Sequence, residues 1–154
     1  MPTAVFQSAE GAKAWVAKLA YPVTVSWVQG VDRTNQQNAL MWRWASEVAK
    51  QRGDVCAEEV QAEWKLHHGV PILRAEDDSF RAFYDSAMMG IDYPTKLEIM
   101  QRGFPITRDM SKAQMVAFMN RVQAECAQRN WIITDPDPGL AEWMQAITKR
   151  KARK

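Results

Sequence analysis

The chain has 154 residues, 47% of them hydrophobic and 25% charged, with a formal net charge of +2, which is the size and composition of one globular domain. No apolar run reaches the roughly 20 residues that cross a bilayer, and the N-terminus lacks the basic stretch and long apolar core of a signal peptide. We therefore expect a cytoplasmic protein without membrane contact. Cys56 and Cys126 are far apart and show no CxxC spacing, so neither a disulfide framework nor a zinc site is predicted.

The first thirty residues are predicted to form a strand, a helix and a second strand. Residues 3–7 have the composition of a short strand. Residues 8–20 repeat apolar side chains at a spacing near 3.6, which indicates a helix. Residues 22–30 alternate valine and tryptophan with small polar side chains, as a half-buried strand does.

The segment RTNQQNALMWRW, residues 33–44, sets two tryptophans among arginines and amides at the start of a predicted helix. Thr34 and Gln37 have the spacing of a capping box, in which the two side chains satisfy each other's backbone amides. The helix is therefore predicted to begin at Thr34 and to end near Gln51, before a glycine.

The two tryptophans of this helix are predicted to have different environments. At 100° per residue one apolar stripe forms, and its members are Leu40, Met41, Trp44, Ala45 and Val48. Trp42 lies about 130° from the centre of this stripe. Trp44 is therefore predicted to belong to the core, and Trp42 is not.

The middle of the chain is predicted to be mainly helical. Residues 56–67 form a helix that glycine and proline close, and residues 70–74 are either a strand or an extended connection. Residues 76–89 form a short helix with acids in the favourable first turn. Residues 92–109 mix a helical turn with an extended stretch.

Two helices are predicted in the C-terminal third. Ser111 and Gln114 have the spacing of a capping box that opens a long helix. Asp137 is expected to cap the last helix, with Pro138 at its first position. The predicted fold class is therefore α+β: a helix-rich single domain, residues 1–148, with a small β-sheet and a docked C-terminal helix.

A basic tail, residues 149–154, ends the chain. Its cations are Lys149, Arg150, Lys151, Arg153 and Lys154, which leave the rest of the chain with a net charge of −3. Such a block either binds a polyanion, because each phosphate contact releases a counterion, or only complements the C-terminal end of a helix.

No catalytic motif such as a Walker loop or HExxH occurs in the sequence. The neighbouring His67 and His68 would point about 100° apart on a helix, so we interpret them as structural, and Cys126 falls on an apolar stripe of the core. Asp77 and Asp78, with nearby acids, leave open a magnesium-dependent nuclease or resolvase. We expect no cofactor and no resident metal, and we expect that the protein is not an enzyme.

An exposed tryptophan has three usual roles: packing on a neighbouring element, anchoring a protein interface, or stacking on a base. Cations lie before, along and beyond the predicted helix that carries Trp42, and they are Arg33, Arg43, Lys50 and Arg52. Arg43 also has the spacing to pair with Glu47. The pattern thus fits nucleic acid, and a pure protein adaptor with Trp42 as its anchor stays open.

Residues 32–51, DRTNQQNALMWRWASEVAKQ, resemble the Arg-(Ser/Thr)-x-x-Gln-Asn-x-x-x-Trp segment of the phage lambda Orf, or NinB, family of recombination proteins. Residues 22–30 and 110–136 are similar to the neighbouring strand and the later long helix of that family. The resemblance implies a homodimer with a surface cleft that prefers single-stranded over duplex DNA and contacts the host single-strand-binding protein. By motif position, the residues that carry over as a functional cluster are Arg33, Gln37, Asn38 and Trp42.

The resemblance also implies a role in a bacterial host cell infected by a bacteriophage. The protein would be a recombination mediator that helps to load a recombinase or annealing protein onto single strands coated by single-strand-binding protein. In this interpretation the cations of the helix and of the tail contact phosphates, and no nuclease or ATPase activity is required.

Overall fold

The computed structural model describes residues 8–20, 22–23 and 33–153, and of Arg33 and Thr34 only the backbone. The chain divides into two compact units, Met1–Val31 and Asp32–Lys154, each of which is described by itself. In the first unit, helix α1 (Ala9–Val16) is capped by Ser8, whose Oγ accepts from the Gly11 amide at 3.1 Å. The helix predicted for residues 8–20 is thus present but shorter.

Helix α2 (Arg33–Arg52) opens the second unit and provides much of its core. It begins before Thr34, so Thr34 lies inside the helix and is not its cap, and the prediction of a start at that residue is wrong by one position. The predicted division between the tryptophans is confirmed: Trp44 is fully buried, whereas Trp42 is 46% exposed.

Helices α3 (Ala57–Trp64), η1 (a π-helical turn, Lys65–Gly69) and α4 (Val70–Glu76) follow one another without a break. Pro71 lies inside this rod, directly after the π-helical turn, where the Val70 amide bonds to the Lys65 carbonyl and the regular i→i−4 series is already interrupted. A Cβ added to Gly69 would lie only 2.5 Å from Ile106 Cγ2, so the turn needs glycine for close packing. The strand or extended connection predicted for residues 70–74 is wrong, because this glycine and proline occur within a helical turn and do not end the helix.

The next helices pack against this rod to form a second hydrophobic cluster. They are α5 (Asp78–Ala87), α6 (Tyr93–Gln101) and the short 3-10 turn η2 (Thr107–Asp109). Asp77 and Asp92 cap α5 and α6 through their side chains. The helix predicted within residues 76–89 is therefore confirmed.

Helices α7 (Lys112–Gln128) and α8 (Pro138–Ala152) complete the unit and pack against each other. The capping box of Ser111 and Gln114 is confirmed by two hydrogen bonds, of 2.9 and 3.2 Å. The Asp137 cap of α8 is also confirmed. Helix α8 continues past the predicted domain boundary at residue 148, and its last turn contains most of the basic tail.

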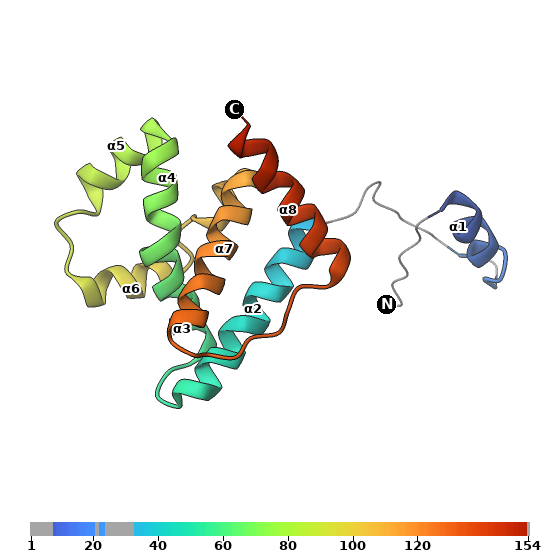
Figure 1. Cartoon of the computed structure of the whole chain (residues 1–154), viewed down its shortest axis with the longest axis horizontal. Coiled ribbons are helices and arrows are strands. Elements are labelled where there is room, and N and C mark those ends of the chain that lie inside the picture. The colour runs from blue at the N-terminus through green and yellow to red at the C-terminus, as the bar shows by residue number, and fades with distance from the viewer. Residues whose placement is uncertain (1–7, 21, 24–32, 154) are drawn as a thin grey trace. The chain divides into compact units, whose positions relative to one another are not determined.

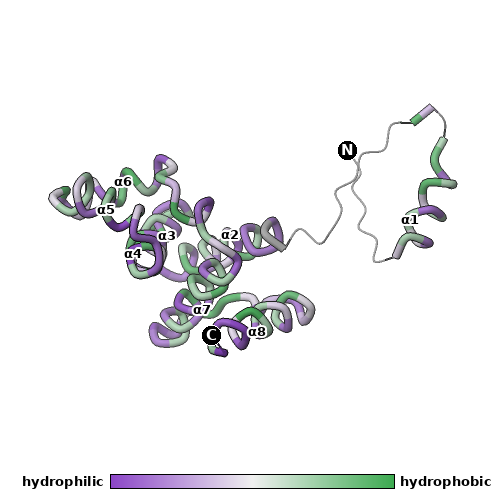
Figure 2. Tube along the Cα trace, turned by 90° about the horizontal axis from the view of Figure 1, so that it is seen from above, coloured by the Kyte–Doolittle hydropathy of each residue, from purple (hydrophilic) through white to green (hydrophobic). Residues whose placement is uncertain are grey.

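The main core lies between α2, α3, α7 and α8, which Figure 1 shows in cyan, green, orange and red. Its largest fully buried side chains include Trp44, Trp64, Phe118 and Met119. Figure 2 shows that α8 changes from mixed hydropathy to strongly hydrophilic at its C-terminal end. None of the helices in the described ranges is both long and apolar enough to cross a bilayer.

The predicted α+β class with a small β-sheet is wrong, since residues 8–20, 22–23 and 33–153 form helices and connections and include no β-strand. The described part of the chain is all-α. The strand predicted for residues 3–7, and residues 24–30 of the second predicted strand, lie outside the described residues. Val23, at the start of that second segment, is not in a strand.

Candidate nucleic-acid interface

The outward face of α2 presents one aromatic side chain among polar and small residues. Its exposed members are Asn35, Gln36, Asn38, Ala39, Trp42, Arg43, Ser46 and Lys50. Asn38, Ala39 and Ser46 lie three or four positions from Trp42, which makes them its neighbours on the helix surface. Because these neighbours are short, almost half of the indole surface stays open to solvent.

The inward face of α2 is fixed to the extended segment between α7 and α8. Trp44 Nε1 donates to the Thr134 carbonyl at 2.6 Å, and the Glu47 carboxylate accepts from the amide of Thr134 at 2.8 Å and from its hydroxyl. Gln51 exchanges two hydrogen bonds with the backbone of Ile132, of 2.7 and 2.8 Å. These contacts fix the rotation of α2 and therefore which side of the helix carries Trp42. Figure 1 shows the segment between α7 and α8 running alongside α2.

Arg43 and Lys50 are exposed cations of α2. Arg43 directly follows Trp42 and is turned about 100° from it around the helix, and Lys50 lies eight residues beyond Trp42, or about 12 Å further along the axis. The predicted pairing of Arg43 with Glu47 is not formed, because Thr134 already occupies that carboxylate. Ion pairs among the described residues include neither Arg43 nor Lys50. The two charges lie seven residues, or about 10 Å, apart along the helix axis, and both are available to an external anion.

Two other predicted site residues are directed elsewhere. Gln37 is only 2% exposed and its Nε2 is buried without a hydrogen-bond partner, so it belongs to the interior and not to the Trp42 face. Arg52 bonds to Glu63 at 2.6 Å and lies 3.7 Å from Asp54. The hydrogen bond with Glu63 raises the pKa of the Arg52 guanidinium, whose charge is thus used within the fold. The side chain of Arg33 lies outside the described residues.

The cations of the tail form a second basic surface. Lys149, Arg150, Lys151 and Arg153 are all exposed at the end of α8, and Lys154 lies outside the described residues. Lys151 forms an ion pair with Glu76, at the end of α4. Lys149, Arg150 and Arg153 have no such partner in the described part of the chain.

A polar network that sequence reasoning missed joins the ends of α2 and α7. The guanidinium carbons of Arg52 and Arg129 lie 5.9 and 5.2 Å from the ring centre of Trp131. His68 Nε2 lies 2.7 Å from Glu125, which also pairs with Arg129. The hydrogen bond from His68 is the largest of the interactions that lower the pKa of Glu125. Two of its four contacts, Arg52 with Trp131 and His68 with Glu125, join residues far apart in sequence, so no local pattern could have revealed them.

His67 has a different partner from its neighbour. Its Nε2 lies 2.8 Å from the Tyr93 hydroxyl, and the two rings meet edge to face. Both histidines therefore have side-chain partners within the fold, as the structural interpretation requires. The partners are the Tyr93 hydroxyl and the Glu125 carboxylate, and the helix continues past both histidines through Gly69.

The acids that favoured a nuclease have local structural roles. Asp77 caps α5 through the Phe80 amide, and Asp78 pairs with Arg81 on the same helix. Asp85 pairs with Arg74. Within the described ranges no three side chains of histidine, cysteine or acid type are grouped as metal ligands.

Cys126 is buried in the main core, as predicted. Burial raises the pKa of its thiol to about 11.

Comparison with protein-family models, with curated proteins and with solved structures finds no match to this chain, so the resemblance of residues 32–51 to the Orf family stays a prediction.

Proposed function

We propose that this protein binds single-stranded DNA through the outward face of α2 and acts as a phage-type recombination mediator. The observation that carries the proposal is Trp42, which is 46% exposed on a helix that also exposes Arg43 and Lys50. An aromatic ring next to cations without acidic partners is the usual combination for strands without sequence preference.

In this proposal the Trp42 ring contacts the bases and the cations contact the phosphates. A base that stacks on an aromatic side chain contributes roughly 1–3 kcal/mol, and it does so for any sequence, because every base has a flat face. Arg43 and Lys50 supply phosphate contacts, which make the affinity dependent on salt. Bases in duplex DNA are already stacked on each other, so the Trp42 face selects single strands.

The biological role follows from the family resemblance. As a mediator, the protein helps a recombinase or annealing protein to replace the host single-strand-binding protein on coated strands. A homodimer would bring two α2 faces to one strand and increase the affinity through multivalency. This activity needs neither a cofactor nor a bond-breaking step.

The test is a titration of labelled single-stranded and duplex oligonucleotides at two salt concentrations. Trp42→Ala should weaken single-strand binding about 5- to 150-fold, the factor that corresponds to 1–3 kcal/mol, while Trp42→Phe retains most of the affinity. Phe83→Ala is the matched control, because Phe83 is 56% exposed on α5, away from α2. Equal affinities of wild type and Trp42→Ala for DNA, with loss of a protein complex alone, would assign Trp42 to a protein adaptor.

The nuclease alternative is tested with the same strands. Incubation of wild type with branched and single-stranded DNA plus magnesium should leave both substrates intact. Cleavage that disappears in Asp77→Ala or Asp78→Ala would replace the mediator proposal with a metal-dependent nuclease.

A further inference from the structure

Glu76 occupies an unusual position at the C-terminal end of α4. The carbonyl end of a helix carries partial negative charge and normally disfavours an acid there. Glu76 is held by groups from two other helices: Lys151 of α8 bonds to Oε1, and Gln114 of α7 donates to Oε2 at 3.2 Å. Three helices therefore meet at one carboxylate.

The surroundings of this carboxylate have the properties of an anion site. The hydrogen bond from Lys151 is the largest of the interactions that lower the pKa of Glu76, and Arg121 of α7 also lies close enough to lower it. Lys151 and Gln114 thus donate to one carboxylate from α8 and α7, and Arg121 adds a weaker positive charge at longer range. In the free protein the acid of α4 occupies the point where these groups meet.

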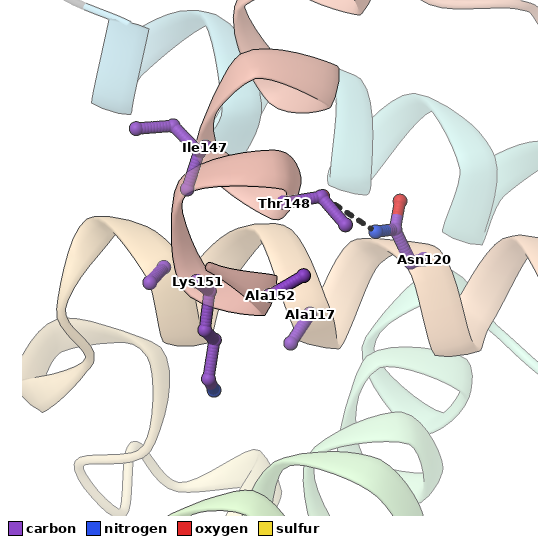
Figure 3. A pocket seen from close by; sticks show the side chains of 7 residues that line it. Ala117, Asn120, Ile147, Thr148, Lys151 and Ala152 are labelled. Carbon is purple, nitrogen blue, oxygen red and sulfur yellow. Dashed lines mark hydrogen bonds between the residues drawn. The ribbon is translucent and has the colours of Figure 1, made fainter. Parts of the chain in front are cut away.

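Next to this point a shallow cavity of about 270 Å³ runs between α7 and α8 (Figure 3). Its lining residues are Ala113, Ala117, Asn120, Ile147, Thr148, Lys151 and Ala152. The Asn120 amide lies 3.5 Å from the Thr148 hydroxyl and provides a polar strip in an otherwise apolar groove. Lys151 belongs to both the groove and the Glu76 contact, so an anion on Lys151 would place its attached group over the alanines.

We propose that this α7–α8 groove is a second contact site for single-stranded DNA, in which a backbone phosphate replaces the Glu76 carboxylate on Lys151 and the attached nucleotide covers the apolar floor. This inference rests on the proposed function and adds a site to the α2 face. Glu76 then competes with the phosphate for Lys151.

Size and charge favour a nucleotide over a folded partner. Pockets for drug-sized ligands measure about 300–1,000 Å³, so a cavity of about 270 Å³ fits one small group and not a helix of another protein. The neighbouring cations Lys149, Arg150 and Arg153 suit an occupant whose negative charges repeat along a chain.

The first test removes the competitor. Glu76→Gln should bind single-stranded DNA about two- to fivefold more tightly than wild type, the range expected when an exposed ion pair is removed. Glu98→Gln is the matched control. It removes the same charge and breaks an exposed ion pair, that of Glu98 with Arg102 at α6. Lys151→Gln should weaken binding and should abolish the gain from Glu76→Gln when the two are combined.

The second test fills the groove without changing charge. Ala113→Trp should weaken single-strand binding, and an oligonucleotide with abasic positions should reduce the difference from wild type. Ala124→Trp is the control, since Ala124 is exposed on α7 and does not line the groove. Thermal melting by circular dichroism verifies that each variant is folded.

The outcomes separate this site from the proposed function. If wild type does not bind single strands, the proposed function fails. If wild type binds but Glu76→Gln raises the affinity for single-stranded DNA no more than Glu98→Gln does, the groove site alone is refuted. The same holds if Glu76→Gln raises this affinity equally in the Lys151→Gln background. If Glu76→Gln raises the affinity for an acidic peptide and not for DNA, the groove is assigned to a protein partner and this proposal is refuted.

Discussion

Trp42 and Trp44 stand two positions apart on α2, and we predict that their loss has opposite consequences. Trp44 is fully buried, and its indole donates to the Thr134 carbonyl at 2.6 Å. Truncation of a core tryptophan to alanine costs about 3–5 kcal/mol in transfer and cavity terms. Trp42 is 46% exposed, so about half of its surface is buried and Trp42→Ala should cost no more than about half of that amount.

The assay is urea unfolding of both variants, followed by circular dichroism, beside the DNA titration. Trp44→Ala should lower the free energy of unfolding by about 3–5 kcal/mol. Trp44→Phe keeps an aromatic ring but removes the hydrogen bond and part of the buried indole. It should cost at least about 1–3 kcal/mol, because the Thr134 carbonyl loses its partner and a small cavity forms. Trp42→Ala should lower DNA affinity and should lower the free energy of unfolding by no more than about half as much as Trp44→Ala.

Two results would refute this reasoning. Equal destabilisation by Trp42→Ala and Trp44→Ala would show that the outward face of α2 is covered in solution. A Trp42→Ala variant that loses neither stability nor DNA affinity would show that the ring has no stabilising contact in the free protein or in the DNA complex.

Four further predictions concern other parts of the chain. Gly69→Ala should destabilise the protein by about 1–3 kcal/mol in chemical denaturation, because its Cβ would lie 2.5 Å from a core methyl group. Because the folded pKa of Glu125 is lowered, its stabilising contribution is present above the unfolded value of about 4.3 and is lost as pH falls through the folded value. Glu125→Gln should therefore flatten the acid limb of the stability profile. A thiol reagent should modify exposed Cys56 in the native protein and reach Cys126, whose pKa is raised to about 11, only after denaturation. Deletion of residues 149–154 should reduce the slope of log affinity against log salt by about 0.7 for each lost phosphate contact, and an unchanged slope would exclude the tail from binding.

The predictions that succeeded depend on interactions within a few residues. The capping box of Ser111 and Gln114 and the cap at Asp137 need only local geometry, and both are present. The separation of Trp42 from Trp44 needs only the helical period, because a helix that packs on one side must bury the stripe and expose the rest.

The corrections concern features that depend on partners distant in sequence. Gln37 fitted a cap or a ligand contact equally well, yet the packing of the unit buries it. Arg52 could not be separated from the other cations of α2 until Glu63 appeared beside it. The local sequence pattern of residues 70–74 predicts an extended segment, but these residues are helical. Glycine occurs within the helical rod because position 69 lies close to Ile106.

The sequence by itself determined most helices of residues 33–153, several of their caps and the face of α2 that carries Trp42, because hydrophobic period and capping act over short distances. Only the tertiary structure decided the all-α class of the described residues, the cations left without acidic partners and the meeting of Glu76 with Lys151. These features join residues up to 75 positions apart. Whether two such side chains meet depends on how the helices pack, which no local pattern encodes.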